Sequence, residues 1–475
     1  MKRTKWLMLL VVFAMIVAAC SSDSDDETTT TAAASGDDTA TTTTAASGDD
    51  TATTTTAAAS DDTTSDDMVD VSGTEVSVFA APTGDEGASI QATFDVYNEA
   101  TGGVVTYEGS DDFEAQLRIR VDGGNPPDIA ITPQPGSICV FADAGEIVAL
   151  EDMGMDIAAL EAAHGAYFMN LGKCADGKHY SIPTNANYKS IVWYNKPVFD
   201  AAGYTIPETW DEMVALSAQM VADGQTPWCI GLGSDAATGW PGTDWIEDIM
   251  VRTAGADVYN QWSNHEIPFN DPSVKAAFDT YGEIMFGEGF VLGGAAGVSA
   301  IDFRDAPDPM FNEPPSCMLH RQASFIANFF PEPLPREDAA FFNFPAIDTS
   351  LPAAAMGGGE LAMVFNNRPE VGAALLSYAG PEYQCIQASG AGVPGIERIS
   401  ANADTPNDCY VTDTVKLQAA AVAAALGANG FVFDASDLMP PAVGQGSFWT
   451  GMIDWTRGTS TDEVLDSIEN SWPSS

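Results

Sequence analysis

The sequence predicts an α/β protein whose two lobes form a hinged clamp around a cleft, preceded by an export signal and a tether. Three observations support this. The first 72 residues have the composition of a leader and a spacer, not of a folded domain. Residues 73–475 are long enough for two α/β lobes. Within them, strand and helix patterns alternate repeatedly, as in sheets covered by helices.

Residues 1–19 have the layout of an export signal, with three basic residues among the first five. The apolar run 6–17 is about 12 residues long, shorter than the roughly 20 residues of a bilayer span. Small residues then precede Cys20, as at a lipoprotein cleavage site. We therefore expect Cys20 to be the lipidated N-terminus. The alternative is an ordinary secretory signal in which Cys20 is incidental.

Residues 20–72 are expected to form a disordered tether. They are almost entirely Ser, Thr, Ala, Asp and Gly in a loose repeat, so they cannot offset their ordering entropy by apolar burial. Their aspartates repel one another and keep the segment extended. The segment would lift a folded module off a membrane, and the sequence leaves O-glycosylation of its threonines open.

The chain is strongly acidic, with 68 Asp and Glu against 18 Lys and Arg. Thirteen of the acids lie in 21–72 and three of the bases in the signal, which leaves 55 acids and 15 bases in 73–475. This balance argues against nucleic acid and against direct binding to an anionic membrane surface. The acids are spread along the module, which favours general surface acidity over a cationic ligand.

Six cysteines follow Cys20, an even number that suggests disulfides in an exported protein. Fifteen pairings are possible. The simplest is sequential: Cys139 with Cys174, Cys229 with Cys317, and Cys385 with Cys409. There is no CxxC pair and the four histidines are isolated, so we expect neither a metal site nor a cofactor.

The first lobe opens with residues 75–80, which alternate as a strand. Apolar residues at one-face spacing over 90–97 then predict a helix. Asp111 and Glu114 form a capping-box pair before a second helix. Residues 129–131 form a brief apolar strand, and this strand–helix–strand order implies a parallel sheet.

The pattern recurs in a second lobe. Thr209 and Glu212 form another capping box, and the helix that follows is expected to lead into a strand over 228–232. Residues 191–195 are expected to enter this lobe as a strand, and residues 341–347 to leave it.

An Ala-rich helix is predicted over 412–426 in the C-terminal part. The expected boundaries are 73–186 for the first part of lobe I and 187–345 for lobe II. Residues 346–475 would return to lobe I and add C-terminal helices that cross between the lobes.

Several motifs resemble extracellular solute-binding protein family 1, the lipid-anchored receptors of ABC importers, and its α-glucoside-binding members in particular. They are NPPDIA at 125–130, WYNK at 193–196, TGWPGTDWIED at 238–248, HEIPF at 265–269, RQASF at 321–325 and FDASDLMP at 433–440. The resemblance covers most of residues 74–473, and the TGWPGTDW block is its most specific part.

The resemblance implies a maltose-binding-protein-like fold with hinges near 183–188 and 344–348. It further implies a monomer on the outer face of the cytoplasmic membrane that binds a carbohydrate without chemistry. The ligand would be an α-glucoside or another small oligosaccharide, delivered to an ABC permease.

A sugar presents flat C–H faces and a rim of hydroxyls, so its receptor needs aromatic platforms and planar polar groups. Trp240, Asp244 and Trp245 supply both in one Gly/Pro-rich turn. The alternatives to ligand contact are that one of the two tryptophans belongs to the core and that Asp244 caps a helix.

Residues at the ends of the first strands are also expected to face the cleft. Thr83, Asp85 and Glu86 lie between a strand end and a helix start, and Gln134 follows the strand at 129–131. Asp111 is similarly placed. For Asp85, Glu86 and Asp111, the alternative role is to cap a helix.

Phe325 falls where related receptors carry a cleft aromatic. Gly358, in a run of three glycines, would let the backbone approach a ligand, unless the run only relaxes a turn. Phe448 and Trp449 are further candidates for stacking against a sugar ring. The alternative is that they are buried in the core.

The sequence motifs that could indicate an enzyme do not support one. GxGxxG at 390–395 contains Pro394, which disfavours the helix that a dinucleotide site requires. Acid pairs that resemble a glycosidase dyad arise by chance in so acidic a chain. Two different functions stay open for this sequence: binding of a polyamine or peptide by the same fold, and a surface sensor or adhesion module.

Overall fold

The computed structural model describes residues 69–331 and 338–473. The expected signal segment, Cys20 and all but the last four residues of the expected tether lie outside this part. Of those four, Val71 is buried against the first strand and helix of the folded unit. No helix among the described residues is both long and apolar enough to cross a bilayer.

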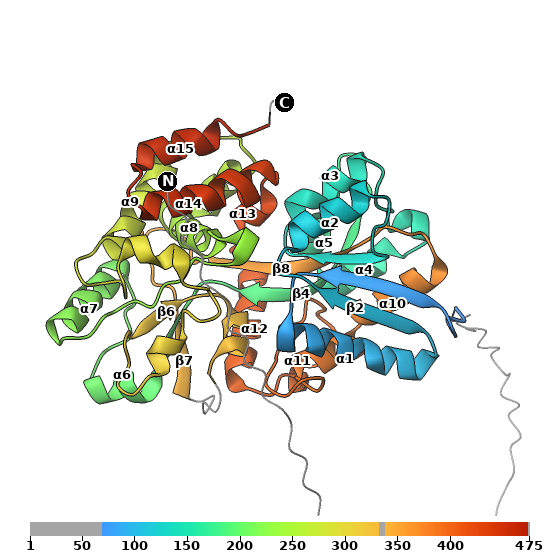
Figure 1. Cartoon of the computed structure of the whole chain (residues 1–475), viewed down its shortest axis with the longest axis horizontal. Helices are drawn as coiled ribbons and strands as arrows, with labels where there is room; N and C mark the ends of the chain where they lie inside the picture. The colour runs from blue at the N-terminus through green and yellow to red at the C-terminus, as the bar shows by residue number, and fades with distance from the viewer. Residues whose placement is uncertain (1–68, 332–337, 474–475) are drawn as a thin grey trace, which may run out of the picture. The chain divides into compact units, whose positions relative to one another are not determined.

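A mixed sheet forms the centre of one lobe (Figure 1). Its strands, in the order β2-β1-β3-β8-β4 with β9 beside β8, are β1 (Glu75–Ala80), β2 (Val104–Gly109), β3 (Ile129–Thr132), β4 (Ser181–Tyr188), β8 (Ala355–Val364) and β9 (Phe431–Phe433). β1 is parallel to β2 and β3, which confirms the predicted strand–helix–strand unit, and β8 is antiparallel to β3 and β4.

Helices cover both faces of this sheet. They are α1 (Gly84–Thr101), α2 (Phe113–Asp122), α3 (Ile138–Asp143), α4 (Ile157–His164), α5 (Ala166–Asn170), α10 (Pro369–Ala379), α11 (Pro381–Ala388) and α12 (Asp413–Gly427). Alternate residues of β1 point to opposite faces. Val78 packs into the cluster that contains Phe94 of α1, and Phe79 lies 5.1 Å from Phe113 of α2.

The other lobe is built on a small antiparallel sheet, β6-β5-β7. Its strands are β5 (Ile191–Asn195), β6 (Leu319–Arg321) and β7 (Ala339–Asn343). Around it lie α6 (Lys196–Ala202), α7 (Trp210–Ala222), α8 (Trp240–Ser263), α9 (Pro272–Met285), α13 (Ala435–Leu438), α14 (Trp449–Thr456) and α15 (Thr461–Glu469).

Two local expectations for this lobe have different outcomes. The Thr209–Glu212 capping box at the start of α7 is confirmed. The strand over 228–232 is wrong. Trp228 makes only isolated bridges, to Val291 and Leu319. The backbone after it bonds to Leu319, the first residue of β6, and then to Val298 and Ile301 outside the strands, so no continuous partner strand is present.

The chain passes between the two sheets at three places in the described residues: after β4, between β7 and β8, and after β9. The strands β4 and β8 run side by side in the middle of Figure 1, and α12 packs on both. The C-terminal α14 and α15 pack against α8 and α9. The fold is therefore α/β and two-lobed.

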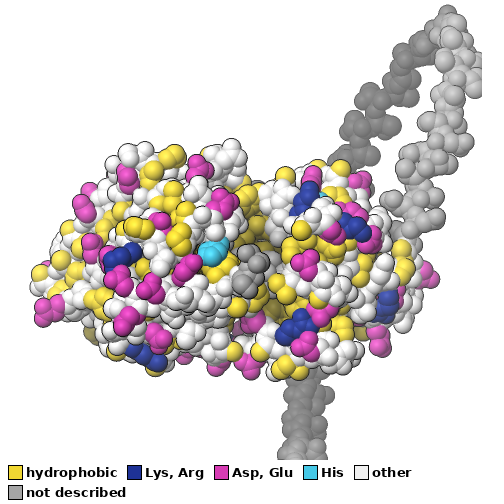
Figure 2. All heavy atoms as spheres, turned by 90° about the horizontal axis from the view of Figure 1, so that it is seen from above, with side chains coloured by type: hydrophobic (Ala, Val, Ile, Leu, Met, Phe, Trp, Pro, Cys, Tyr) yellow, Lys and Arg dark blue, Asp and Glu magenta, His cyan; other side chains and the backbone are white. Residues whose placement is uncertain are grey.

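The six cysteines of the folded unit form three disulfides, in the sequential order that the sequence predicts as the simplest. The pairs are Cys139–Cys174, Cys229–Cys317 and Cys385–Cys409. On the face seen in Figure 2, acidic side chains are scattered and do not gather in one patch.

Candidate functional site

A cavity of about 200 Å³ lies where the two lobes meet. The lobe of the large sheet contributes the segments that follow β1 and β3 and the start of α2. The other lobe contributes the start of α8 and the segments around 303 and 325. The crossing strands β4 and β8, the segment 397–399, α12 and the residues after β9 complete the walls.

Four residues expected from strand ends line this cavity: Thr83, Glu86, Asp111 and Gln134. Thr83 Oγ1 donates a hydrogen bond of 3.1 Å to Asp111, and Gln134 Nε2 donates one of 3.0 Å to Glu114. They meet here because the carboxyl ends of the parallel strands β1 and β3 lie at the same edge of the sheet.

The capping box predicted from Asp111 and Glu114 is wrong. The helix α2 begins at Phe113, with Asp112 at the N-cap and no side-chain cap. Asp111 instead accepts hydrogen bonds from Thr83 and from Arg304 of the other lobe. Contacts with residues distant in sequence therefore bind the Asp111 carboxylate, which the local sequence pattern assigns to capping α2.

Asp85 does not line the cavity. It is exposed in the first turn of α1, one residue before Glu86, which does line it. Consecutive helical residues point about 100° apart, so only one of the two can face the cleft.

Aromatic side chains form one wall. The ring of Trp240 lies 5.1 Å from that of Phe303 and 6.0 Å from that of Phe325, and Phe329 extends the group. All four line the cavity and are partly exposed, and the more deeply buried Trp449 lines it as well. This wall offers apolar faces of the kind that a sugar ring covers.

Trp245, in contrast, is a core residue, which corrects the expectation that it contacts ligand. It is 1% exposed and stacks on Tyr281 at 4.8 Å. The expected turn is in fact the start of α8, and two residues five positions apart on a helix point about 140° from each other. Phe448 is also core, packed on Phe269 at 4.9 Å.

Asp244 does not reach the cavity either. It is fully buried and forms ion pairs with Lys189 at 3.0 Å and Arg321 at 3.0 Å. Lys189, which the sequence analysis missed, lines the cavity and also contacts Asp434. Burial alone would lower the pKa of Lys189, but the carboxylates of Asp244 and Asp434 outweigh it and raise this pKa.

Asp244, Glu247 and Asp434 bring carboxylate oxygens within 4.8 Å of one another, as a metal site would. The surroundings of these residues fit a different role. Lys189 supplies positive charge, and Glu247 accepts hydrogen bonds from the backbone N–H groups of Ala435 and Ser436 at 2.9 and 3.2 Å. The cluster therefore joins α8 to the chain crossing after β9.

Gly358 is not among the residues that line the cavity, whereas its neighbour Gly359 is. A Cβ at Gly358 would lie 3.1 Å from Lys189 Cε, whereas one at Gly359 would lie 2.5 Å from the carbonyl oxygen of Asn185. Both glycines belong to β8. Close contacts with Lys189 and with the neighbouring strand β4 thus explain why they lack side chains, in place of the expected approach to a ligand.

Several cavity residues carry buried polar atoms without a partner among the described residues. They are both amide atoms of Gln418, the indole nitrogen of Trp449 and Nε of Arg398. Arg398 also donates a hydrogen bond of 2.6 Å to Glu360. Gln418 and Arg398 carried no signal in the sequence, because α12 and the segment before it are remote in sequence from the strands that they face.

Three carboxyl groups of the cavity have raised pKa values. Burial raises the pKa of Glu86, although Arg398 opposes it. Burial likewise raises the pKa of Glu114. The pKa of Asp437 is raised well above its ordinary value, first by burial and then by repulsion from Asp434.

The chain is similar to known proteins along most of its length. The family model of bacterial extracellular solute-binding proteins matches residues 80–378. The chain is 38% identical over 400 residues to the osmoprotective compounds-binding protein GgtB of Synechocystis sp., covering 84% of this chain and 92% of GgtB. It is 37% identical over 413 residues to the alpha-glucosides-binding periplasmic protein AglE of Rhizobium meliloti, covering 85% and 88%.

Among solved structures, the maltose-bound MalE3 of T. maritima has a TM-score of 0.64 at 13% identity, covering 84% of this chain and 98% of MalE3. This likeness confirms the predicted maltose-binding-protein-like fold.

Proposed function

The chain belongs to the family of bacterial extracellular solute-binding proteins, and on this premise we propose that it binds a carbohydrate in the interlobe cavity for an ABC importer. The ligand class that fits best is an α-glucoside of disaccharide size. The name of AglE, an alpha-glucosides-binding protein, supports this choice.

The unpartnered polar atoms of the cavity carry the proposal. Gln418 offers a donor and an acceptor, and Trp449 and Arg398 each offer a donor, all buried and without protein partners among the described residues. Leaving such atoms unpaired costs stability. A polyol supplies vicinal hydroxyls that both donate and accept, and its C–H faces suit the aromatic wall around Trp240.

The proposed mechanism is closure of the two lobes about hinges near 183–188, in the part of β4 that precedes one chain crossing, and near 344–348, in the crossing between β7 and β8. The closed form is then presented to the membrane permease. No bond of the ligand is made or broken. Recovery of the bound disaccharide uncleaved after long incubation is the expected result, and release of monosaccharide would contradict it.

We further propose that the protein is a monomer, exported and held on the outer face of the cytoplasmic membrane by lipid on Cys20, with 20–72 as the tether. Metabolic labelling with radioactive palmitate tests the anchor. We expect a labelled wild type and an unlabelled Cys20→Ala variant that is released into the medium. Equal labelling of both would contradict the anchor.

Thermal unfolding of residues 67–475 in the presence of single compounds tests the ligand class. The panel is trehalose, maltose, sucrose, palatinose, glucose, spermidine and a peptide mixture. A ligand at about 100 times its Kd stabilises by roughly 2.7 kcal/mol. A rise in Tm with one disaccharide is expected, and a flat response to every sugar would overturn the proposal.

Gln418→Leu sharpens this test. The variant loses an unpaired buried amide, so the ligand-free protein is expected to keep or raise its Tm while sugar affinity falls more than tenfold. Gln387→Leu is the control for affinity, because Gln387 is also buried, has an unpartnered amide nitrogen and does not line the cavity. Its Oε1 accepts a hydrogen bond from Tyr378, so this control is expected to lose some stability and to keep its affinity. Unchanged affinity in Gln418→Leu would remove Gln418 from the site.

One observation favours a second ligand class. The cavity lining holds seven acids and three bases: Glu86, Asp111, Glu114, Glu360, Glu397, Asp434 and Asp437 against Lys189, Arg304 and Arg398. A polyamine suits this excess of acid. Stabilisation by spermidine with no response to sugars would establish it.

A further inference from the structure

An ion pair joins the two lobes across the cavity. Arg304 Nη1 lies 2.9 Å from Asp111 Oδ1, and both residues line the cavity. Arg304 belongs to the lobe of the small sheet, where the neighbouring Asp302 forms a bridge with Gly233. Asp111 precedes α2 on the large-sheet lobe. The pair therefore bridges the two lobes at the edge of the cavity where both side chains are partly exposed.

Contacts within its own lobe hold the Arg304 side chain in position. Asp302 accepts hydrogen bonds from Arg304 Nε at 2.8 Å and Nη2 at 2.9 Å, a bidentate arrangement, and Asp235 lies 3.5 Å away. On the other lobe, Thr83 donates to the same oxygen of Asp111 at 3.1 Å. Both partners are thus positioned by contacts within their own lobes.

The cavity behind this pair is small. Its volume of about 200 Å³ is below the roughly 300–1,000 Å³ of ligand pockets in general. A chain of several sugar rings cannot be enclosed there while Arg304 and Asp111 remain in contact. A second contact across the lobes, from Asn328 Nδ2 to Glu86 Oε1 at 3.0 Å, restricts the space further.

We propose that Arg304 and Asp111 form a latch that retains a small ligand and excludes longer oligosaccharides. The proposal rests on carbohydrate binding as proposed above. Arg304 and Asp111 act as specificity residues: they slow the release of a ligand that fits and penalise one that must separate them.

Dissociation kinetics test the latch in Arg304→Gln, Asp111→Asn and the double variant. The probes are the disaccharide that most stabilises the wild type and, as a longer α-glucoside, maltotetraose. Each single variant is expected to release the disaccharide up to about fivefold faster, the size expected for a partly exposed ion pair. The double variant should equal the singles, because both remove one interaction.

The matched control is Arg120→Gln. Arg120 pairs with Glu108 inside one lobe, and its side chain is 28% exposed against 26% for Arg304. This variant should release the disaccharide at the wild-type rate. The affinity for maltotetraose relative to the disaccharide should rise in Arg304→Gln and not in Arg120→Gln. Added salt should speed release from the wild type and affect Arg304→Gln less.

Wild-type release rates in Arg304→Gln, or additive effects of the two substitutions, would overturn the latch and leave carbohydrate binding intact. Additive effects would mean that Asp111 contacts the ligand independently of Arg304. Failure of the wild type to bind any sugar of the panel would overturn the proposed function itself.

Discussion

Trp240 and Trp245 have the same side chain, lie five residues apart and differ in environment. Trp240 is the first residue of α8, where its ring faces the cavity beside Phe303. Trp245 is on the other side of the helix, enclosed by Trp228 and Tyr281. The first ring is available to a ligand, and the second holds α8 against its own lobe.

This difference predicts opposite effects of substitution. Trp240→Ala is expected to weaken disaccharide binding well over tenfold with little change in Tm, because it removes a stacking face and no core contact. Trp245→Phe is expected to lower the free energy of unfolding by about 1–3 kcal/mol with affinity nearly unchanged. Calorimetric titration and thermal unfolding of both variants measure the two effects. Wild-type affinity in Trp240→Ala would exclude it from the site.

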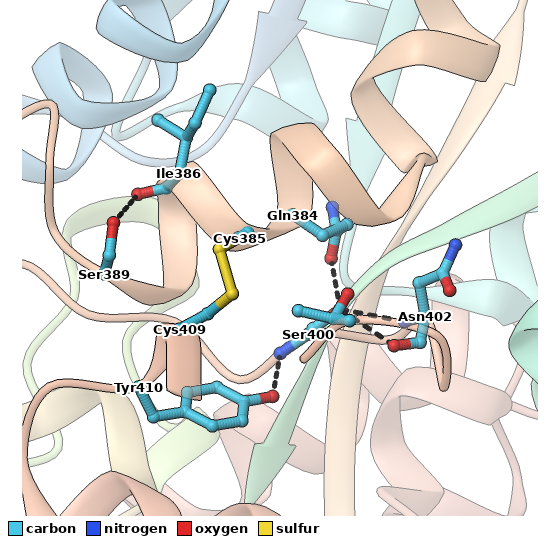
Figure 3. Close-up of a disulfide and its surroundings, with 9 residues drawn as sticks. Gln384, Cys385, Ile386, Ser389, Ser400, Asn402, Cys409 and Tyr410 are labelled. Atoms are coloured by element: carbon cyan, nitrogen blue, oxygen red, sulfur yellow. Dashed lines mark hydrogen bonds between the residues drawn. A yellow bond between two sulfur atoms is a disulfide. The ribbon is translucent and has the colours of Figure 1, made fainter. Parts of the chain in front are cut away.

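At the scale of elements, the disulfide Cys385–Cys409 ties α11 to the segment that carries Arg398. Figure 3 shows Ser400 of this segment between Gln384 and Tyr410: its hydroxyl donates to Gln384 and its N–H donates to the Tyr410 hydroxyl. The segment has little regular structure, so these contacts replace a sheet or helix in holding one wall of the cavity.

Removing this disulfide is therefore expected to affect binding as well as stability. Cys385→Ser with Cys409→Ser should lower the free energy of unfolding by about 3–4 kcal/mol, as expected for the loop that it closes. It should also weaken disaccharide affinity, because the wall near Arg398 loses its position.

The matched control removes the Cys139–Cys174 disulfide, which closes a loop of similar length away from the cavity lining. This variant should lose a similar amount of stability and keep its affinity. Equal affinity in both double variants, measured below their unfolding temperatures, would show that Cys385–Cys409 does not position the wall.

For the whole molecule, two buried histidines make stability depend on pH. Burial lowers the pKa of His320 to about 4, and its Nε2 has no partner among the described residues. Burial also lowers the pKa of His164 to about 4. An unfolded histidine has a pKa of about 6.5, so between these values the unfolded chain binds protons that the folded protein does not.

The free energy of unfolding is therefore expected to fall as the pH falls from about 6.5 to about 4. Each of the two histidines contributes up to about 1.4 kcal/mol per pH unit. Denaturant unfolding of the wild type, His320→Gln and His164→Gln at pH 6.5, 5.5 and 4.5 measures this slope. Each variant should lose less stability on acidification than the wild type, and parallel curves would contradict the assignment.

Elements whose signals are local were predicted well from sequence. The strands at 75–80 and 191–195 and the capping box of α7 depend on neighbouring side chains, and the structure has them at the predicted positions. The strand at 228–232 was wrong because pairing depends on distant partners, which periodicity does not record.

The same division applies to the site. Sequence alone predicts that the segments after β1 and β3 face a cleft, because strand ends in a parallel sheet share one edge. Thr83, Glu86 and Gln134 line the cavity accordingly. The positions of Gln418 and Arg398 in the cavity wall follow from the folded structure alone. These residues are remote in sequence from the other walls, and the chain crossings that bring them together leave no pattern in the sequence.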